Sequence, residues 1–120
     1  MWLFTRDGFY SVVHDDYCDP GELMIRARAI EDLERLVDKL RADDADILVI
    51  RNGDYRYRVK LRSEQWVSYV AAEAAHIDYA NFKNSVAADD QDRSSAYMKI
   101  WEAMYLFQEA KAQFNHWVDD

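Results

Sequence analysis

The chain has 120 residues, of which half are hydrophobic, and it carries a single proline and a formal net charge of −8. This length and hydrophobic content exclude a disordered chain and predict a globular protein with a core of its own. The sequence contains no run of about 18 apolar residues, as a membrane-spanning helix would need, and no signal peptide pattern. Because Cys18 is the single cysteine, no internal disulfide can form, and we expect a cytoplasmic protein.

Charge is distributed unevenly along the chain. Residues 1–62 hold 11 basic and 13 acidic side chains, whereas residues 63–120 hold 4 and 10. We therefore predict one domain, 1–120, with a sheet-rich part (1–62) and an acidic helical part (63–120). The acidic part promotes solubility and could also imitate nucleic acid, while the net charge argues against direct nucleic-acid binding.

Two strands are expected at the start of the chain, at residues 1–5 and 9–14, with a turn at Gly8 between them. The loop at residues 14–21 collects side chains of the kind that bind metals: His14, Asp15, Asp16, Cys18 and Asp19. Their spacing matches no zinc or calcium pattern, so we predict a solvated loop and no metal site.

A third strand is expected at residues 22–29, and a hairpin at residues 46–61. The third strand and the second strand of the hairpin share one pattern. Apolar side chains alternate with cations in both, because strand side chains point to opposite faces in turn. If the two strands are neighbours, five cations share one face of the sheet and form the best candidate binding site: Arg26, Arg28, Arg56, Arg58 and Lys60. This face is either a docking surface for an anionic partner, since arginine suits phosphate and carboxylate, or a solvated surface paired with the chain's own acids.

The hairpin itself is predicted from the pair Asn52-Gly53, which favours a two-residue type I′ turn. That turn places Ile50 opposite Tyr55, and Leu48 opposite Tyr57, with both tyrosines on the core side. A sheet that binds RNA would carry aromatic side chains on the same face as its cations. The predicted register therefore argues against RNA binding.

Helices are expected at residues 30–42 and 64–76, with a short helical turn at 78–86 and a polar loop at 87–93. The longest helix should begin at Ser94 or Ser95 and end near Trp117. Its apolar positions cover roughly 200° of the helix, whereas an ordinary stripe covers about 100°. The surplus would meet either another helix of the chain or a second copy in a homodimer, with these interface candidates: Tyr97, Trp101, Met104, Tyr105, Phe107 and Phe114.

Enzyme signatures are weak in this sequence. It contains no phosphate-binding glycine loop, no nucleophile elbow and no histidine pair at metal-binding spacing. Cys18 has no base that can be placed beside it. His76 with Asp78 could form an acid/base pair but is better explained as the end of a helix. We predict a non-catalytic protein without a cofactor.

Several segments resemble a group of short uncharacterised bacterial proteins. The resemblance extends to about Trp101 and is carried by MWLFT at residues 1–5, GFYSVV at 8–13, RAR at 26–28, DLE at 32–34, DYRYR at 54–58, IDY at 77–79 and NFK at 81–83. It implies a bacterial or phage origin and no particular activity.

The expected fold is α+β. An antiparallel, or mixed, sheet of about five strands would be covered on one face by helices, in the order βββαββαα. The expected function is a protein-interaction or regulatory module, one version of which is an acidic inhibitor. The alternative is a domain that binds a small anionic ligand or nucleotide on the arginine-bearing sheet face.

Overall fold

The computed structural model describes residues 1–119, together with their side chains except those of residues 87 and 114–119. The chain divides into two compact units, Met1–Asp78 and Tyr79–Asp120.

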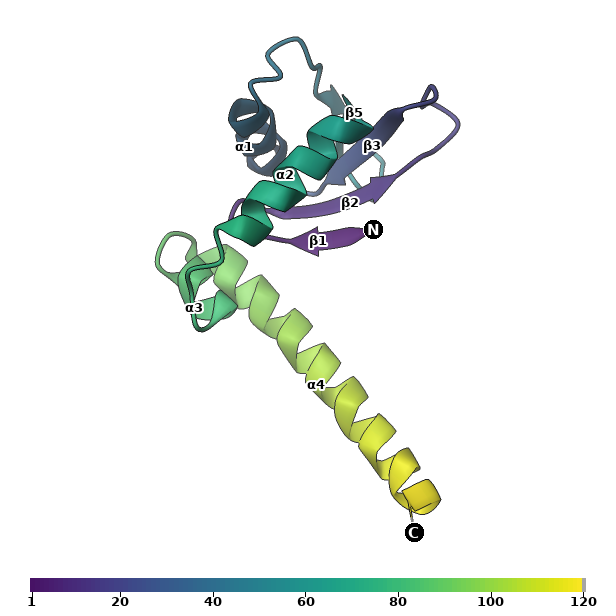
Figure 1. The fold of residues 1–120 in the computed structure, drawn as a ribbon, viewed down its shortest axis with the longest axis vertical. Helices are drawn as coiled ribbons and strands as arrows, with labels where there is room; N and C mark the ends of the chain where they lie inside the picture. The colour runs from purple at the N-terminus through teal and green to yellow at the C-terminus, as the bar shows by residue number, and fades with distance from the viewer. Residues whose placement is uncertain (120) are drawn as a thin grey trace. The chain divides into compact units, whose positions relative to one another are not determined.

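The first unit contains a five-stranded sheet and two helices (Figure 1). The strands are β1 (Trp2–Phe4), β2 (Phe9–Val13), β3 (Glu22–Ala27), β4 (Leu48–Val49) and β5 (Tyr57–Arg62), and the helices are α1 (Ile30–Leu40) and α2 (Ser63–Ala75). The spatial order is β1-β2-β3-β5-β4, and every neighbouring pair is antiparallel. The predicted α+β class and the order βββαββαα are confirmed, with one further short helix, α3, before the last.

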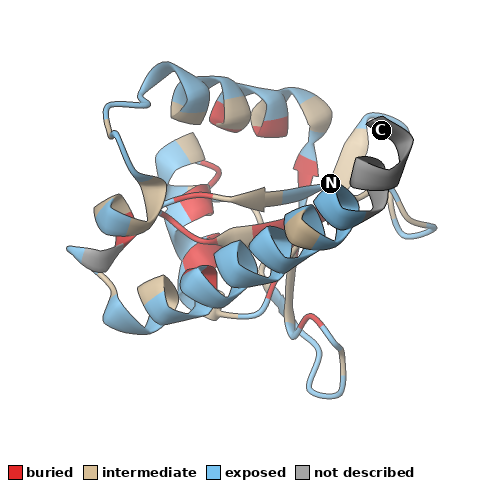
Figure 2. Cartoon of the chain, turned by 90° about the horizontal axis from the view of Figure 1, so that it is seen from below, coloured by how far each residue is buried: buried red, intermediate tan, exposed pale blue. Residues whose placement is uncertain are grey.

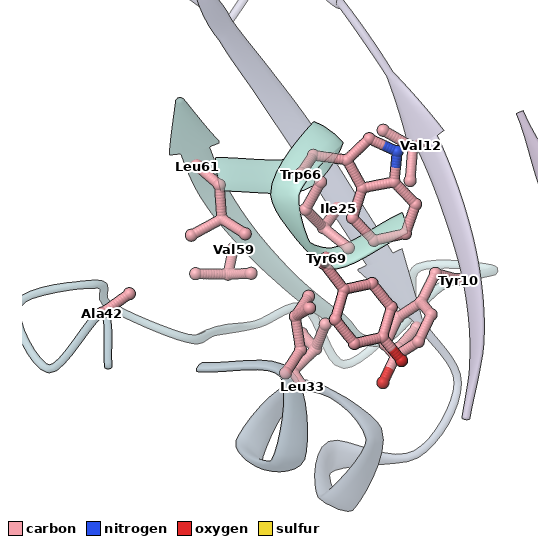
Figure 3. Close-up of a cluster of buried hydrophobic side chains, with 11 residues drawn as sticks. Tyr10, Val12, Ile25, Leu33, Ala42, Val59, Leu61, Trp66 and Tyr69 are labelled. Carbon is pink, nitrogen blue, oxygen red and sulfur yellow. The ribbon is translucent and has the colours of Figure 1, made fainter. Parts of the chain in front are cut away.

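Both helices of this unit lie on the same face of the sheet, where they form the core (Figure 3). Leu33 and Leu36 of α1 are fully buried because their spacing places them on the same side of the helix. Trp66 and Tyr69 of α2 stack on each other, with ring centroids 5.5 Å apart. The sheet contributes these side chains to the same cluster: Tyr10, Val12, Ile25, Ala27, Val59 and Leu61.

The hairpin differs from its prediction by one residue of register. Leu48 pairs with Arg58 and Val49 pairs with Tyr57, so the predicted pairing of Leu48 with Tyr57 is wrong. The backbone N–H of Ile50 donates to the carbonyl of Arg56 at 2.7 Å, and the loop between these two residues covers 51–55. Within it neither residue of the pair 52–53 has a positive φ, so the predicted type I′ turn is also wrong.

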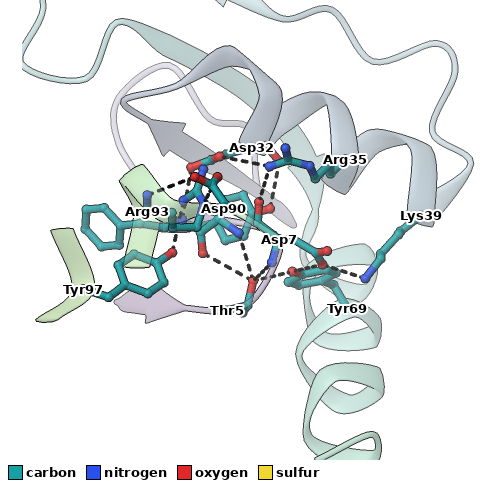
Figure 4. A network of polar contacts seen from close by, with 12 residues as sticks. Thr5, Asp7, Asp32, Arg35, Lys39, Tyr69, Asp90, Arg93 and Tyr97 are labelled. Carbon is teal, nitrogen blue, oxygen red and sulfur yellow. Dashed lines mark hydrogen bonds and ion pairs between the residues drawn. The ribbon is translucent and has the colours of Figure 1, made fainter. Parts of the chain in front are cut away.

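The second unit contains α3 (Phe82–Ala87) and α4 (Gln91–Asp119). Phe82 stacks on Tyr97 with ring centroids 5.7 Å apart, which fixes the two helices against each other. α4 begins before the predicted Ser94 or Ser95, because the carboxylate of Asp90 accepts the backbone N–H of Arg93 at 3.0 Å (Figure 4) and thereby caps the helix at Gln91. The segment 91–93, predicted as loop, is therefore helical.

The described part of α4 exposes much of its apolar surface (Figure 2). Even so, no helix among residues 1–119 has both the length and the apolar character needed to cross a membrane.

Candidate anion-binding face of the sheet

The strand register brings the predicted cations together on the outer face of the sheet, which we define as the face opposite α1 and α2. Arg26 of β3 pairs with Arg58 of β5, and Met24 pairs with Lys60. The alternate residues of the same strands, such as Ile25 and Val59, lie in the core. β3 and β5 are therefore neighbours, as the prediction required, and their cations share one face.

One row of this face crosses four of the five strands, β1, β2, β3 and β5. The register aligns Trp2 with Ser11, Ser11 with Arg26, and Arg26 with Arg58. Because side chains directly opposite each other on adjacent strands point to the same side, Trp2 belongs to the same face as the arginines. The aromatic and cationic groups are thus arranged along a single line across the strands.

Tyr55 is the main correction to the predicted site. It was expected on the core side, yet it precedes β5 and its ring lies beneath two guanidinium groups. The Cζ atoms of Arg26 and Arg28 are 4.6 and 4.2 Å from the ring centroid, and Tyr55 is only 4% exposed. Tyr57, by contrast, packs against the core as predicted. The predicted separation from the arginines is therefore wrong for Tyr55 and right for Tyr57.

Further aromatic side chains of β1 and β2 extend the outer face from Tyr55. The ring of Phe9 lies 6.3 Å from that of Tyr55 and stacks on Phe4 at 4.4 Å. Trp2 meets Phe9 edge to face at 6.0 Å and is 69% exposed. Sequence reasoning missed this group, although Trp2 and Phe4 alternate with Leu3 in a way that predicts one shared face.

The cations are held mainly by neutral oxygen atoms. Arg26 donates to the Ser11 hydroxyl at 2.7 Å, and Lys60 donates to the Tyr17 carbonyl at 3.2 Å. Arg28 donates to the backbone carbonyl of Asp54 at 2.7 Å. These contacts orient the positive charges without cancelling them.

Arg26, Arg28, Arg58 and Lys60 form a group of four cations on this face. Among the described ion pairs, one carboxylate pairs with a member of this group. Arg58 Nη2 lies 3.6 Å from Asp54 Oδ1, and the Asp54 side chain is 70% exposed. An ion pair this exposed screens its partner weakly. Arg56, the fifth predicted cation, is exposed and lies one residue before β5. The outer face therefore carries excess positive charge on a protein that is acidic overall.

A second polar cluster of the first unit links the β1–β2 turn to both helices (Figure 4). The Asp7 carboxylate accepts from Lys39 Nζ and from the Tyr69 hydroxyl, both at 2.7 Å, and Lys39 also pairs with Glu73 at 3.2 Å. Burial alone would raise the pKa of Asp7, but the hydrogen bonds from Lys39 and Tyr69 hold it below its ordinary value of 3.8. Burial raises the pKa of Tyr69. An ionised acid and a protonated phenol bonded to each other act as a structural link.

The other candidate residues of the sequence have partners that do not suggest catalysis. Burial raises the pKa of the Cys18 thiol, which disfavours the nucleophilic thiolate. Asp78 pairs with Arg6 at 3.2 Å, while His76 Nδ1 contacts the Ala72 carbonyl at 2.6 Å. The side chains of His76 and Asp78 thus have different partners, although Arg6 also donates to the His76 carbonyl at 3.3 Å. Among the described residues, no group of three or more metal-ligating side chains converges.

The predicted interface candidates on α4 differ in their exposure. Tyr97 is buried against Phe82, so it is unavailable to a partner. The exposed candidates are Trp101, Met104, Tyr105 and Phe107. Phe114 lies outside the residues whose side chains the structure describes.

Comparison of the chain with protein-family models, with curated proteins and with solved structures finds no significant match.

Proposed function

We propose that this chain is a non-catalytic binding module, of bacterial or phage origin and cytoplasmic, whose outer sheet face binds an anionic partner. The observation that carries the proposal is the collection of Arg26, Arg28, Arg58 and Lys60 on one face, with Asp54 as the carboxylate in ion-pair reach among the described residues. Guanidinium groups present several N–H donors in a plane, which suits phosphate and carboxylate groups.

The arginine side chains are also held in fixed orientations, which favours anion binding in addition to their charge. Arg26 and Arg28 both lie on the Tyr55 ring, and Arg58 Nε donates to the Tyr55 carbonyl at 3.4 Å. A guanidinium group that is already oriented loses less conformational freedom when it binds an anion. Tyr55 therefore acts as a platform that positions the arginines.

The experiment measures the binding of inorganic polyphosphate by calorimetry at low and moderate salt. The double variant Arg26→Glu/Arg58→Glu should bind at least about tenfold more weakly, because two attractive charges become repulsive. The matched control is Arg41→Glu/Lys99→Glu, which makes the same change in net charge at exposed positions outside the outer face and should bind nearly as the parent does.

A variant that is expected to bind more tightly distinguishes a lost contact from misfolding. Asp54→Asn removes the carboxylate near Arg58 but keeps a side-chain carbonyl for the N–H of Tyr55, which the Asp54 side chain accepts at 2.9 Å. It should bind polyphosphate about two- to threefold more tightly, and the gain should shrink as salt screens the charges. Equal loss of binding in the double variant and its control would contradict the proposal.

A second candidate function is self-association through α4, and it is favoured by a specific observation. The exposed side chains of Ile100, Met104 and Phe107 follow the i, i+4, i+7 spacing that forms one stripe along a helix. Two copies of such a stripe can pack on each other, which would bury the apolar surface of both. This candidate is independent of the outer face.

A further inference from the structure

Trp2 is the feature of the outer face that anion binding alone does not explain. Trp2 is 69% exposed, on a face whose other aromatic rings pack together. It belongs to the same cross-strand row as Arg26 and Arg58. With strands about 4.8 Å apart, these arginines lie about 10 and 14 Å from Trp2 across the sheet.

A partner that fits this row must carry both planar rings and negative charges at short intervals. An acidic peptide supplies carboxylates without regularly spaced rings, and a nucleic-acid duplex hides its base faces within the stack. A single strand presents an unstacked base and a phosphate at every nucleotide. Proteins that bind single strands accordingly combine aromatic side chains with a positively charged surface.

The arginines also keep donors for a phosphate. A guanidinium group has five N–H donors, and Ser11 accepts from two nitrogens of Arg26, Nε at 3.4 Å and Nη2 at 2.7 Å. The net charge of −8 opposes long-range attraction of any polyanion. Stacking depends little on net charge, so it would favour single strands over other anions.

We propose that the partner bound by the outer face is a single-stranded nucleic acid, with a base stacked on Trp2 and the neighbouring phosphates bound by Arg26, Arg58 and Lys60. This inference rests on the proposed function and specifies its ligand. It revises the expectation from charge and predicted register that direct nucleic-acid binding is disfavoured, because Tyr55, Phe9 and Trp2 share the face with the cations.

The test uses the full chain and fluorescently labelled oligo(dT) and oligo(U) of about 12 nucleotides, within the range that one such surface covers. Anisotropy titrations should show binding to at least one oligonucleotide, and Trp2→Ala should weaken it about 5- to 150-fold, the contribution of one stacked base. Trp2→Phe should retain most of the affinity. The control Tyr105→Ala removes an exposed aromatic ring from α4 and should have no effect.

Tryptophan fluorescence supplies a second readout. Stacking of a base on Trp2 should quench part of the protein's emission, and Trp2→Phe should abolish that part while it preserves binding. The salt dependence should give a slope of log K against log salt near −2, as expected for about three phosphate contacts with a single strand. A thermal melt of each variant checks that folding is unchanged.

The outcomes separate the two proposals. If polyphosphate and poly-L-glutamate bind through the arginines while the oligonucleotides do not, or if Trp2→Ala binds oligonucleotides as the parent does, the single-strand proposal is wrong and anion binding stands. A matched duplex that binds more tightly than the single strand would also overturn it. If no polyanion responds to Arg26→Glu/Arg58→Glu, both proposals are wrong.

Discussion

At the residue scale, Asp7 shows how one charged group can link three elements. Its side chain lies in the β1–β2 turn and bonds to Lys39 of α1 and Tyr69 of α2. The hydroxyl of Tyr69 also lies 2.9 Å from that of Thr5. A buried carboxylate with several donors is stable only while it is ionised, so the folded state favours the charged form.

The first prediction concerns pH. Because the pKa of Asp7 is lower in the folded protein than its ordinary value of 3.8, the unfolded chain binds the proton more readily. The stabilising contribution of the ionised Asp7 is therefore complete above pH 3.8 and is lost as the pH falls through the lower pKa of the folded state. Urea unfolding between about pH 6 and pH 3 should show a smaller decline in Asp7→Asn than in the parent. The exposed Asp44→Asn should behave as the parent, and equal curves for all three proteins would contradict this role.

The second prediction concerns Gly8, which is buried beside Asp32. A Cβ atom at Gly8 would lie 2.7 Å from Asp32 Oδ2. Asp32 cannot move easily, because its carboxylate accepts the N–H of Phe9 at 3.1 Å and pairs with Arg35 at 3.6 Å. Gly8→Ala should therefore lower the free energy of unfolding by about 1–3 kcal/mol.

A double-mutant cycle checks the physical reason for this loss. In an Asp32→Gly background the whole side chain is absent, including the Cβ atom that would lie 2.6 Å from the added methyl group, so Gly8→Ala should destabilise the protein much less than in the parent. An equal loss in both backgrounds, measured by chemical denaturation, would show that backbone conformation and not the contact with Asp32 is responsible.

At the element scale, the repeating patterns of the sequence were sufficient where neighbouring residues determine the structure. Alternation predicted β3 and β5, and their cations share a face as expected. The leucine stripe of α1 predicted that helix to within its last turn. In both cases the burial of one side of the element contributes most to its formation, and the period of the apolar residues can be read from the sequence.

The hairpin that sequence reasoning placed in the wrong register depends on contacts between distant residues. The two-residue turn at Asn52-Gly53 does not form, and Tyr55 instead packs under Arg26 and Arg28, which lie about thirty positions earlier in the chain. The start of α4 was missed for a local reason, because Asp90 caps the helix although Ser94 has an equally suitable side chain. The aromatic half of the candidate site could have been predicted from the alternation in β1, but the position of Tyr55 could not.

The third prediction tests self-association through α4. Met104 is 58% exposed and lies in the middle of the stripe formed with Ile100 and Phe107. Met104→Glu should shift a dimer to monomer in light scattering at moderate salt, because the added charge would be buried in the interface. The control is Leu106→Glu, which changes another apolar residue, 61% exposed, two positions along and on nearly the opposite side of the helix. A parent protein that is monomeric at all concentrations would exclude the homodimer.

At the scale of the whole molecule, the division into two compact units is reflected in the core. Every member of the central hydrophobic cluster belongs to the unit Met1–Asp78. The outer face also consists entirely of residues from this unit. The hydrophobic core and the candidate binding site therefore both belong to the first unit.

The fourth prediction follows from that coincidence. A fragment of residues 1–78 should fold by itself, because a unit that contains its own core can fold independently. Circular dichroism should show a cooperative thermal transition, and the fragment should bind polyphosphate as the full chain does. A fragment without a cooperative transition would show that residues 79–120 are needed for stability.

The brevity of β4 also has a consequence for how the protein behaves at high concentration. A strand at the margin of a sheet offers unpaired backbone groups on which another molecule can add a strand, and this is a common route to fibrils. β4 consists of Leu48 and Val49, both exposed, and so provides too short a template for such growth. The full-length hairpin suggested by the sequence would have provided a longer one. The loop that buries Tyr55 therefore also reduces the tendency of the protein to aggregate through the β4 edge of its sheet.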